Sequence, residues 1–262
     1  MSLYQGDKAL SQSYKHANKH ASGGSDPITP ESIGAAPAPF KPAGKSYLTF
    51  SSPNSFTLKV NDATKHWDGT LEYSTDTSAW TTWDGTTTLS AVDNDGEYVL
   101  YLRGTGNTKI TGLGADGPTE TYKWVLTGTD IACVGNIENL LDYATVESGQ
   151  HPTMAVGCYS DMFSGCTGLT QAPTLPATTL ADRCYGSMFS GCTSLTHAPA
   201  LPATTLTREC YYSMFSGCTS LTQAPALPAT TLTNACYYSK FSQQVKLVEQ
   251  IFLCNIYKRL QP

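Results

Sequence analysis

The sequence of 262 residues has few charged side chains and no long apolar run. Only 14% of its residues are charged and its formal net charge is −5 at pH 7, whereas a protein that binds nucleic acid through the phosphates needs a basic stripe. No stretch approaches the ~20 apolar residues that span a bilayer, and the first thirty residues contain no apolar run of signal-peptide length. We therefore expect no nucleic-acid partner, no membrane span, synthesis in a cytoplasm and no exit by the general secretion route.

The sequence also lacks the short motifs that mark common enzymes. It contains no G-x-S-x-G nucleophile elbow, no H-E-x-x-H zinc motif and no P-loop. Its Asp and Glu residues are scattered among turn segments, which leaves a glycosidase-like carboxylate pair as an open alternative. His151 stands before Pro152 without a partner that the sequence identifies. We expect a protein that is not an enzyme and needs no cofactor.

Glycine and proline are plentiful, with 22 and 15 residues, and they favour turns, short strands and loops over long helices. Between Tyr47 and Ile110 five runs alternate in the manner of β-strands: YLTF, SFTLKV, LEYS, TTTLSA and EYVLYLRG. Turn sequences such as Asp68-Gly69 and Asn94-Asp95-Gly96 separate these runs. We therefore expect a mainly β protein with short helices and a small antiparallel β-sandwich over 46–127.

The second half of the chain is a tandem repeat with a period of 26 residues. Full copies start at Cys158, Cys184 and Cys210, and a partial copy starts at Cys236. Such a period indicates units that stack on each other and bury a shared core. We therefore expect a short repeat solenoid over 128–262, in which each unit contributes a helical turn, a corner, a short strand and a return loop.

The expected helical turn depends on residue spacing. In the second copy Cys184 and Met188 are four positions apart, as are Tyr185 and Phe189, and residues four apart share a face of a helix. Gly191 follows where a helix favours a left-handed C-terminal residue. The prolines later in each copy lack an N–H donor, so they limit the strand that follows to a few ladder bonds.

The segments on either side of the array differ from the repeats. The preceding segment, YKWVLTGTDIACVGNIENLLDYA, predicts a strand and then a short helix with apolar positions Ile137, Leu140 and Leu141. Asn136 is a suitable capping residue for that helix, which we expect to close the N-terminal end of the solenoid. The repeat stops before 243–262, and this segment is either a capping helix or the frameshifted remnant of a longer array.

Seven of the nine cysteines recur in phase within the repeats, with C-x7-C spacing inside each copy. A structural zinc site favours C-x2-C spacing, so we interpret these cysteines as small buried side chains stacked in a ladder. In a reducing compartment they are expected to be thiols. Disulfides between adjacent turns stay open as the alternative.

One segment of the repeats and one segment of the middle of the chain resemble known modules. FSGCTSLTQAPALP is similar to the F-x-G-C-x-x-L-x-x-x-x-L-P core of BspA-type leucine-rich repeats, which occur in surface proteins of gut and oral bacteria and in phages that infect them. This resemblance covers about 158–242. LEYSTDTSAWTTW resembles the short β-domains that often precede such repeats. The resemblance implies an α/β leucine-rich-repeat solenoid behind a β-sandwich spacer.

The N-terminal segment 1–45 resembles a part of phage tails. Its KHANKHASGGSDPITPESIGA is similar to the H-A-x-x-H-x-x-G-G-x-D-x-I segment near the N-terminus of phage tail-fibre and baseplate-associated proteins. The resemblance implies attachment to tail or baseplate proteins, a place in the virion and, by analogy, a homotrimer. His16 and His20 are four apart and can share a helix face as metal ligands, but spacing fixes no third ligand, so we favour a docking or turn segment.

Recognition residues are expected where the copies differ, because variation within a fixed frame favours exposed contacts. These positions are Asp161, His197, Arg208, Tyr212 and Tyr238. The leading hypothesis is a phage host-recognition protein that binds a bacterial surface protein or glycan through its repeats. The alternatives are a BspA-like adhesin on a bacterial cell surface and a depolymerase of surface glycans.

Overall fold

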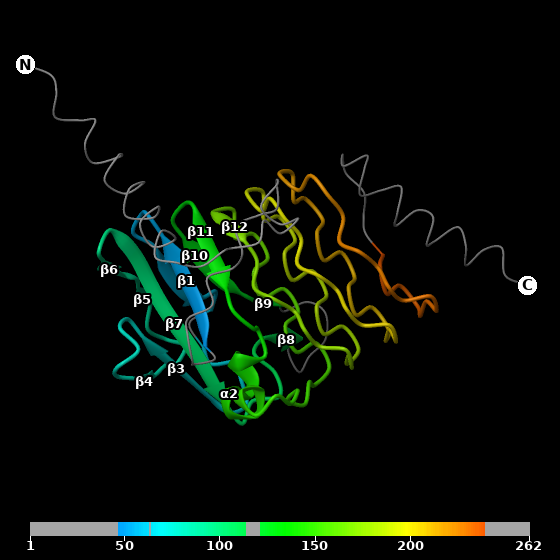
Figure 1. Cartoon of the computed structure of the whole chain (residues 1–262), viewed down its shortest axis with the longest axis horizontal. Coiled ribbons are helices and arrows are strands. Elements are labelled where there is room, and N and C mark those ends of the chain that lie inside the picture. The colour runs from blue at the N-terminus through cyan, green and yellow to red at the C-terminus, as the bar shows by residue number, and fades with distance from the viewer. Residues whose placement is uncertain (1–46, 63, 114–120, 239–262) are drawn as a thin grey trace, which may run out of the picture. The chain divides into compact units, whose positions relative to one another are not determined.

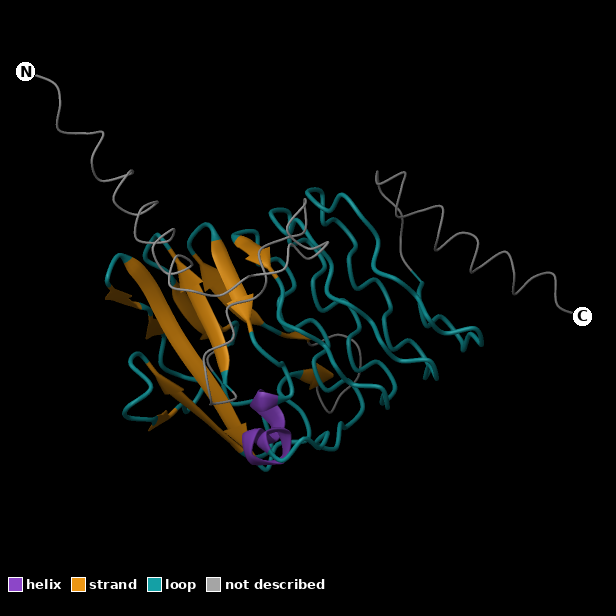
Figure 2. Cartoon of the chain, viewed as in Figure 1, coloured by secondary structure: helices purple, strands orange, loops and turns teal. Residues whose placement is uncertain are grey.

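The computed structural model describes residues 47–62, 64–113 and 121–238, all within one compact unit, Phe40–Pro262 (Figure 1). This part of the chain is mainly β, as predicted, and contains a single helix (Figure 2). His16, His20, the rest of the predicted attachment segment 1–45 and the predicted C-terminal helix lie outside the described residues.

A seven-stranded mixed sheet forms the larger β-layer, with the order β12-β11-β1-β7-β3-β4 and β6 paired to β7. A three-stranded antiparallel sheet has the order β10-β2-β5, and β8 pairs with β9. The bounds of the strands are β1 Leu48–Ser52, β2 Thr57–Val60, β3 Thr70–Ser74, β4 Thr81–Thr82, β5 Leu89–Ser90, β6 Val92–Asn94, β7 Glu97–Thr105, β8 Gly112–Leu113, β9 Thr121–Tyr122, β10 Trp124–Thr127, β11 Ile131–Val134 and β12 Leu169–Gln171. All the predicted runs contain strands, and the one parallel pairing among the named strands joins β11 to β12 in the first repeat.

The predicted turn at Asn94-Asp95-Gly96 is present and joins β6 to β7. Asp95 and Gly96 both have positive φ, at 55° and 89°, as a two-residue type I′ hairpin requires. The Asp93 carboxylate accepts a hydrogen bond from the Gly96 N–H at 2.8 Å. This turn fixes the register of β7, the central strand whose inward side chains reach the core.

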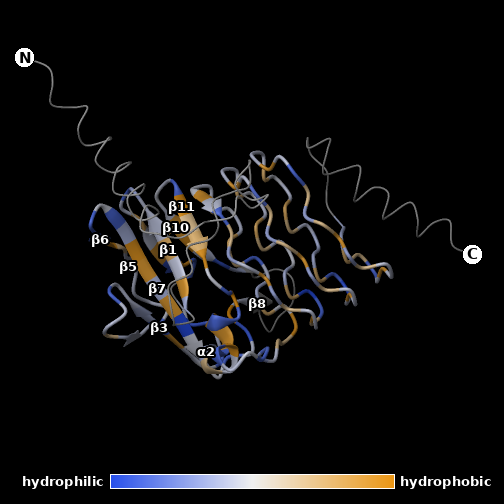
Figure 3. Ribbon diagram, viewed as in Figure 1, coloured by the Kyte–Doolittle hydropathy of each residue, from blue (hydrophilic) through white to orange (hydrophobic). Residues whose placement is uncertain are grey.

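The hydrophobic core runs without interruption from the sheets into the repeats, across the predicted boundary at 127/128. Apolar residues are concentrated on β7 and β11 (Figure 3). At the junction the fully buried ring of Trp124 lies 5.6 Å from that of Trp83 and 6.0 Å from that of Phe163, which belongs to the first repeat. Phe50 of β1 contacts the same Phe163 ring at 6.1 Å. The first repeat is therefore packed directly on the β-layers.

The helix α2, Asn139–Glu147, follows β11 as predicted and lies against β7. Asn136 is not the N-cap as predicted, because Glu138 occupies that position; the Asn136 side-chain oxygen instead accepts the Glu138 N–H at 2.9 Å. Asn107 joins the helix to the sheet, because its amide donates to the carbonyl oxygens of Leu140 at 2.9 Å and Thr70 at 2.8 Å. These bonds satisfy a buried polar side chain that would otherwise be costly.

The repeats stack through backbone hydrogen bonds between residues 25 positions apart. The amide of Tyr159 donates to the carbonyl of Cys184 at 2.8 Å, that of Tyr185 to Cys210 at 3.0 Å, and that of Tyr211 to Cys236 at 2.9 Å. We call one 26-residue unit of the stacked backbone a coil. At the start of each copy every second amide makes such a bond to the coil of the next copy. The amides between them donate three residues back within their own coil, which closes a series of β-turns.

The predicted helical turn at the start of each repeat is wrong. A left-handed residue interrupts this segment in each of the three full copies, namely Asp161 at φ 57°, Ser187 at 52° and Ser213 at 49°. A helix also directs each amide four residues back along its own chain, whereas here half of the amides bond to the neighbouring coil. The spacing of four between buried residues arises from consecutive β-turns.

Stacking places equivalent side chains of successive copies in columns. The Phe163, Phe189 and Phe215 rings lie nearly parallel at 5.7 and 5.8 Å. The column that begins at Tyr159 and ends at Tyr237 has ring spacings of 5.5–5.8 Å. These rings are buried, so the recurring aromatic residues form the core of the array.

Candidate functional site

The position two residues after the first cysteine of each copy differs between copies and forms one column. It holds Ser160, Gly186, Tyr212 and Tyr238. The first two are buried, whereas the Tyr238 side chain is 42% exposed. The Tyr212 and Tyr238 rings stack at 5.1 Å with an interplanar angle of 12°. Two of the five predicted recognition residues therefore lie together, and one of them is well exposed.

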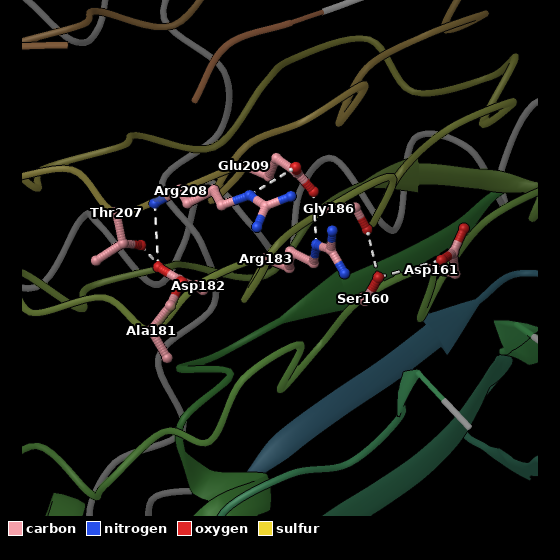
Figure 4. Close-up of polar contacts among 9 residues, drawn as sticks. All are labelled: Ser160, Asp161, Ala181, Asp182, Arg183, Gly186, Thr207, Arg208 and Glu209. Atoms are coloured by element: carbon pink, nitrogen blue, oxygen red, sulfur yellow. Dashed lines mark hydrogen bonds and ion pairs between the residues drawn. The ribbon is translucent and has the colours of Figure 1, made fainter. Parts of the chain in front are cut away.

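A second column of changing residues runs beside the tyrosines and carries charge. It holds Arg183 and Glu209, whose Nε and Oε2 atoms are 2.5 Å apart. Arg208 binds the other carboxylate oxygen of Glu209 at 3.0 Å (Figure 4). The hydrogen bond from Arg183, followed by that from Arg208, lowers the pKa of the Glu209 carboxyl, so this group is ionised at neutral pH. The predicted residue Arg208 is thus held in a three-residue ionic network.

Arg183 and Glu209 were missed by the choice of candidate residues, although the sequence carries a signal for them. They occupy the same position in successive copies and have opposite charge. In-phase positions of a stacked repeat are neighbours in space, so an Arg in one copy and a Glu in the next predict an ion pair. The residues at this position of successive copies therefore vary together, because an Arg in one copy is matched by a Glu in the next.

Asp161 follows Ser160, at the buried end of the column that holds Tyr212 and Tyr238. Its amide donates to the Gly186 carbonyl at 2.8 Å, and the Ser160 hydroxyl lies 3.1 Å from its carboxylate and 3.2 Å from the same carbonyl (Figure 4). Burial raises the pKa of the Asp161 carboxyl. Asp161 is half-buried, so its polar bonds serve mainly to hold the first two coils together.

His197 is in another part of its coil. It is exposed, makes a parallel β-bridge with Gln171, and its Nδ1 lies 2.9 Å from the Thr196 hydroxyl. None of its described contacts joins it to the tyrosine column or to the ionic network. The structure therefore stacks Tyr212 on Tyr238, links Arg208 to Arg183 and Glu209 through ion pairs, and places His197 apart.

His151 does have a partner, contrary to the prediction. Its Nδ1 lies 2.8 and 3.0 Å from the two carboxylate oxygens of Glu138. The Glu138 side chain is 1% exposed and that of His151 is 53% exposed. Glu138 begins α2, so the pair fixes the loop after the helix to its start. A buried carboxylate needs such a partner because an unpaired buried charge is very costly.

The cysteines of the described residues are all buried free thiols, as predicted for a ladder of small side chains. Cys158, Cys184, Cys210 and Cys236 form one column, with a second formed by Cys166, Cys192 and Cys218. Within the described ranges no group of three or more His, Cys, Asp or Glu residues is placed to hold a metal ion. The cysteine columns therefore contribute packing to the core of the array.

Burial should protect these thiols from chemical modification. It raises the pKa of Cys166 and Cys210 to about 11 and that of Cys218 to about 12. Thiolate is the reactive form, so at about pH 8 we expect slow reaction with an aromatic disulfide reagent in the folded protein, faster reaction as the pH rises, and full reaction in denaturant. The Cys254→Ser variant removes the ninth thiol, which lies outside the described residues. Rapid labelling of this folded variant would contradict the buried columns.

Comparison with known proteins gives no independent identification. No family model, no curated protein and no solved structure matches this chain. Among the residues that the structure describes, no helix is long and apolar enough to cross a membrane.

Proposed function

We propose that this protein is a phage tail-fibre or receptor-binding protein that recognises a bacterial surface receptor through its repeats. In this proposal 1–45 attaches to the tail or baseplate, 46–127 forms a β-sandwich spacer, and the 26-residue units form a short leucine-rich-repeat-like solenoid of the BspA type. The virion location and a homotrimeric fibre follow by analogy with the N-terminal motif. The protein binds its receptor without processing it.

The observation that carries the proposal is that different positions of the repeat form its core and its variable surface. The cysteine and aromatic positions that stay the same between copies, such as Cys184 and Phe189, are buried. Several positions that change, including Arg208 and Tyr238, are exposed. A fixed core with variable surface positions is the arrangement that repeat proteins use to present extended binding surfaces. An extended surface of this kind suits adhesion better than catalysis in a deep pocket.

The direct test is binding of the labelled full-length chain to a panel of gut bacterial isolates and their purified envelopes. We expect saturable binding to a subset of strains, strongly reduced in the Tyr212→Ala/Tyr238→Ala double variant. The Val92→Ala variant is the matched control, because Val92 is an exposed apolar residue on β6, outside the repeats. Binding to no strain, or equal binding by both variants, would contradict the proposal.

The same incubations separate recognition from enzymatic action. We expect no new reducing ends in the envelope polysaccharide after prolonged incubation with the full-length chain. Release of reducing ends above the level produced by heat-inactivated protein would favour the depolymerase and overturn the non-enzymatic assignment. Sedimentation equilibrium of the purified full-length chain tests the proposed trimer.

A further inference from the structure

The tyrosine pair and the ionic network belong to one surface, which we call the tyrosine–arginine patch: Arg183, Arg208, Glu209, Tyr212 and Tyr238. Two β-turns place its columns side by side. The Tyr212 amide donates to the Glu209 carbonyl at 3.1 Å. The Tyr238 amide donates to the carbonyl three residues before it, also at 3.1 Å. The tyrosine pair thereby lies one β-turn after the column that holds Arg183 and Glu209.

The polar half of the patch contains both donors and acceptors. Both oxygens of Glu209 are occupied, each by the Nε of one arginine. Within the described residues these ion pairs leave the terminal Nη groups of Arg183 and Arg208 without a hydrogen bond. Asp182 adjoins the network, because its Oδ1 accepts the Arg208 backbone N–H at 3.1 Å. Guanidinium groups donate only and carboxylates accept only, so the patch suits a ligand that can do both.

Charge narrows the class of ligand. The guanidinium groups of Arg183 and Arg208 are balanced by the carboxylates of Glu209 and Asp182. A strongly anionic ligand therefore gains no net attraction here. Hydroxyl groups can accept from arginine and donate to Asp182, and they carry no charge that the patch must match. A polyhydroxylated neutral ligand fits this balance.

The apolar half of the patch is small. Among described residues the exposed large hydrophobic side chains are Val92, Val156 and Tyr238. Val92 is on β6, and Val156 is aligned with Arg208 two coils earlier. Tyr238 is therefore the exposed apolar anchor of the patch. Stable protein–protein interfaces need about 20–30 residues on each side and an apolar centre, whereas one sugar ring needs a single aromatic surface.

We propose that the tyrosine–arginine patch binds neighbouring neutral hexose units of a bacterial surface glycan. The C–H face of one hexose packs on the exposed surface of Tyr238, which is held in place by its stack on Tyr212. The hydroxyls of an adjoining hexose accept hydrogen bonds from Arg183 and Arg208 and donate to Asp182. These three residues belong to the two coils before that of Tyr238. This inference rests on the proposed receptor-binding function and names the chemistry of its ligand.

The test measures binding of the full-length chain to immobilised dextran, mannan and galactan, with polygalacturonate as the acidic comparison. We expect saturable binding to at least one neutral polymer and little dependence on salt. Tyr238→Ala should weaken it by about tenfold or more, because the aromatic surface is lost. Tyr238→Phe keeps the ring and should bind within about twofold of the original chain. Val92→Ala should bind normally, and unchanged thermal unfolding shows that the variants are folded.

The outcomes distinguish this inference from the proposed function. If the chain binds cells and that binding survives periodate oxidation of surface diols but is lost after protease treatment, receptor recognition stands and the glycan assignment is overturned. Binding to polygalacturonate alone, or to no polymer, also overturns the assignment, as does equal binding by Tyr238→Ala and the original chain. Failure to bind any cell contradicts the proposed function itself.

Discussion

Replacement of Phe189 with alanine is expected to lower the free energy of unfolding by about 3–5 kcal/mol. Phe189 is fully buried, and its ring is stacked between those of Phe163 at 5.7 Å and Phe215 at 5.8 Å. Alanine would leave a cavity in the middle of the column, and neighbours that are bonded to the coils on both sides have little freedom to fill it. Urea denaturation followed by fluorescence measures the loss.

The control for this substitution is Thr204→Ala. Thr204 is an exposed residue of the same repeat, so its replacement should change the free energy of unfolding by less than about 0.5 kcal/mol. A loss below about 1 kcal/mol for Phe189→Ala would mean that the column does not hold the array together.

Gly104→Ala should be at least as damaging, for a steric reason. A Cβ atom at Gly104 on β7 would lie 1.7 Å from the carbonyl oxygen of Leu140 in α2 and 2.5 Å from its carbon. Both are backbone atoms that no side-chain rotation can move. The helix would have to leave the sheet, and Asn107 would lose its bond to Leu140. We expect a loss of more than about 4 kcal/mol, seen as a collapse of the melting temperature or failure to fold.

Gly186→Ala is the matched control for that clash. A Cβ there would meet the Arg183 carbonyl oxygen at 3.4 Å and the Ser160 hydroxyl at 3.5 Å, which are ordinary contact distances. Its φ lies outside the left-handed region, so alanine should be tolerated with little change in melting temperature. A stable, cooperatively unfolding Gly104→Ala protein would show that α2 does not pack on β7 as described.

The strands and α2 could be predicted because their sequences carry local signals. Alternating apolar residues in EYVLYLRG correspond to β7, and the Asn94-Asp95-Gly96 turn before it has the expected positive φ values. The coil geometry of the repeats could not be predicted in the same way. A spacing of four is shared by helices and by consecutive β-turns. The left-handed residues that decide between them, Asp161, Ser187 and Ser213, are not glycines.

The candidate site was predictable to the extent that it depends on single positions. Differences between copies selected Tyr212 and Tyr238, whose rings stack, and Arg208, which pairs with Glu209. Contacts between side chains needed the stacking itself. The Arg183–Glu209 pair spans 26 residues, and the His151–Glu138 pair depends on how the loop after α2 returns to its start. Neither pair has a local motif, so a reading of each residue by itself misses both.

The backbone hydrogen bonds between residues 25 positions apart allow the number of repeat units to change without loss of the core. Among the described residues, each middle coil is bonded to the coil before it and the coil after it through the same set of backbone groups. Deletion or duplication of one whole unit would therefore leave every remaining coil with equivalent neighbours. Recombination between the near-identical copies in the gene would change the number of units in a single event. Each product would keep its core and present a different order of exposed side chains.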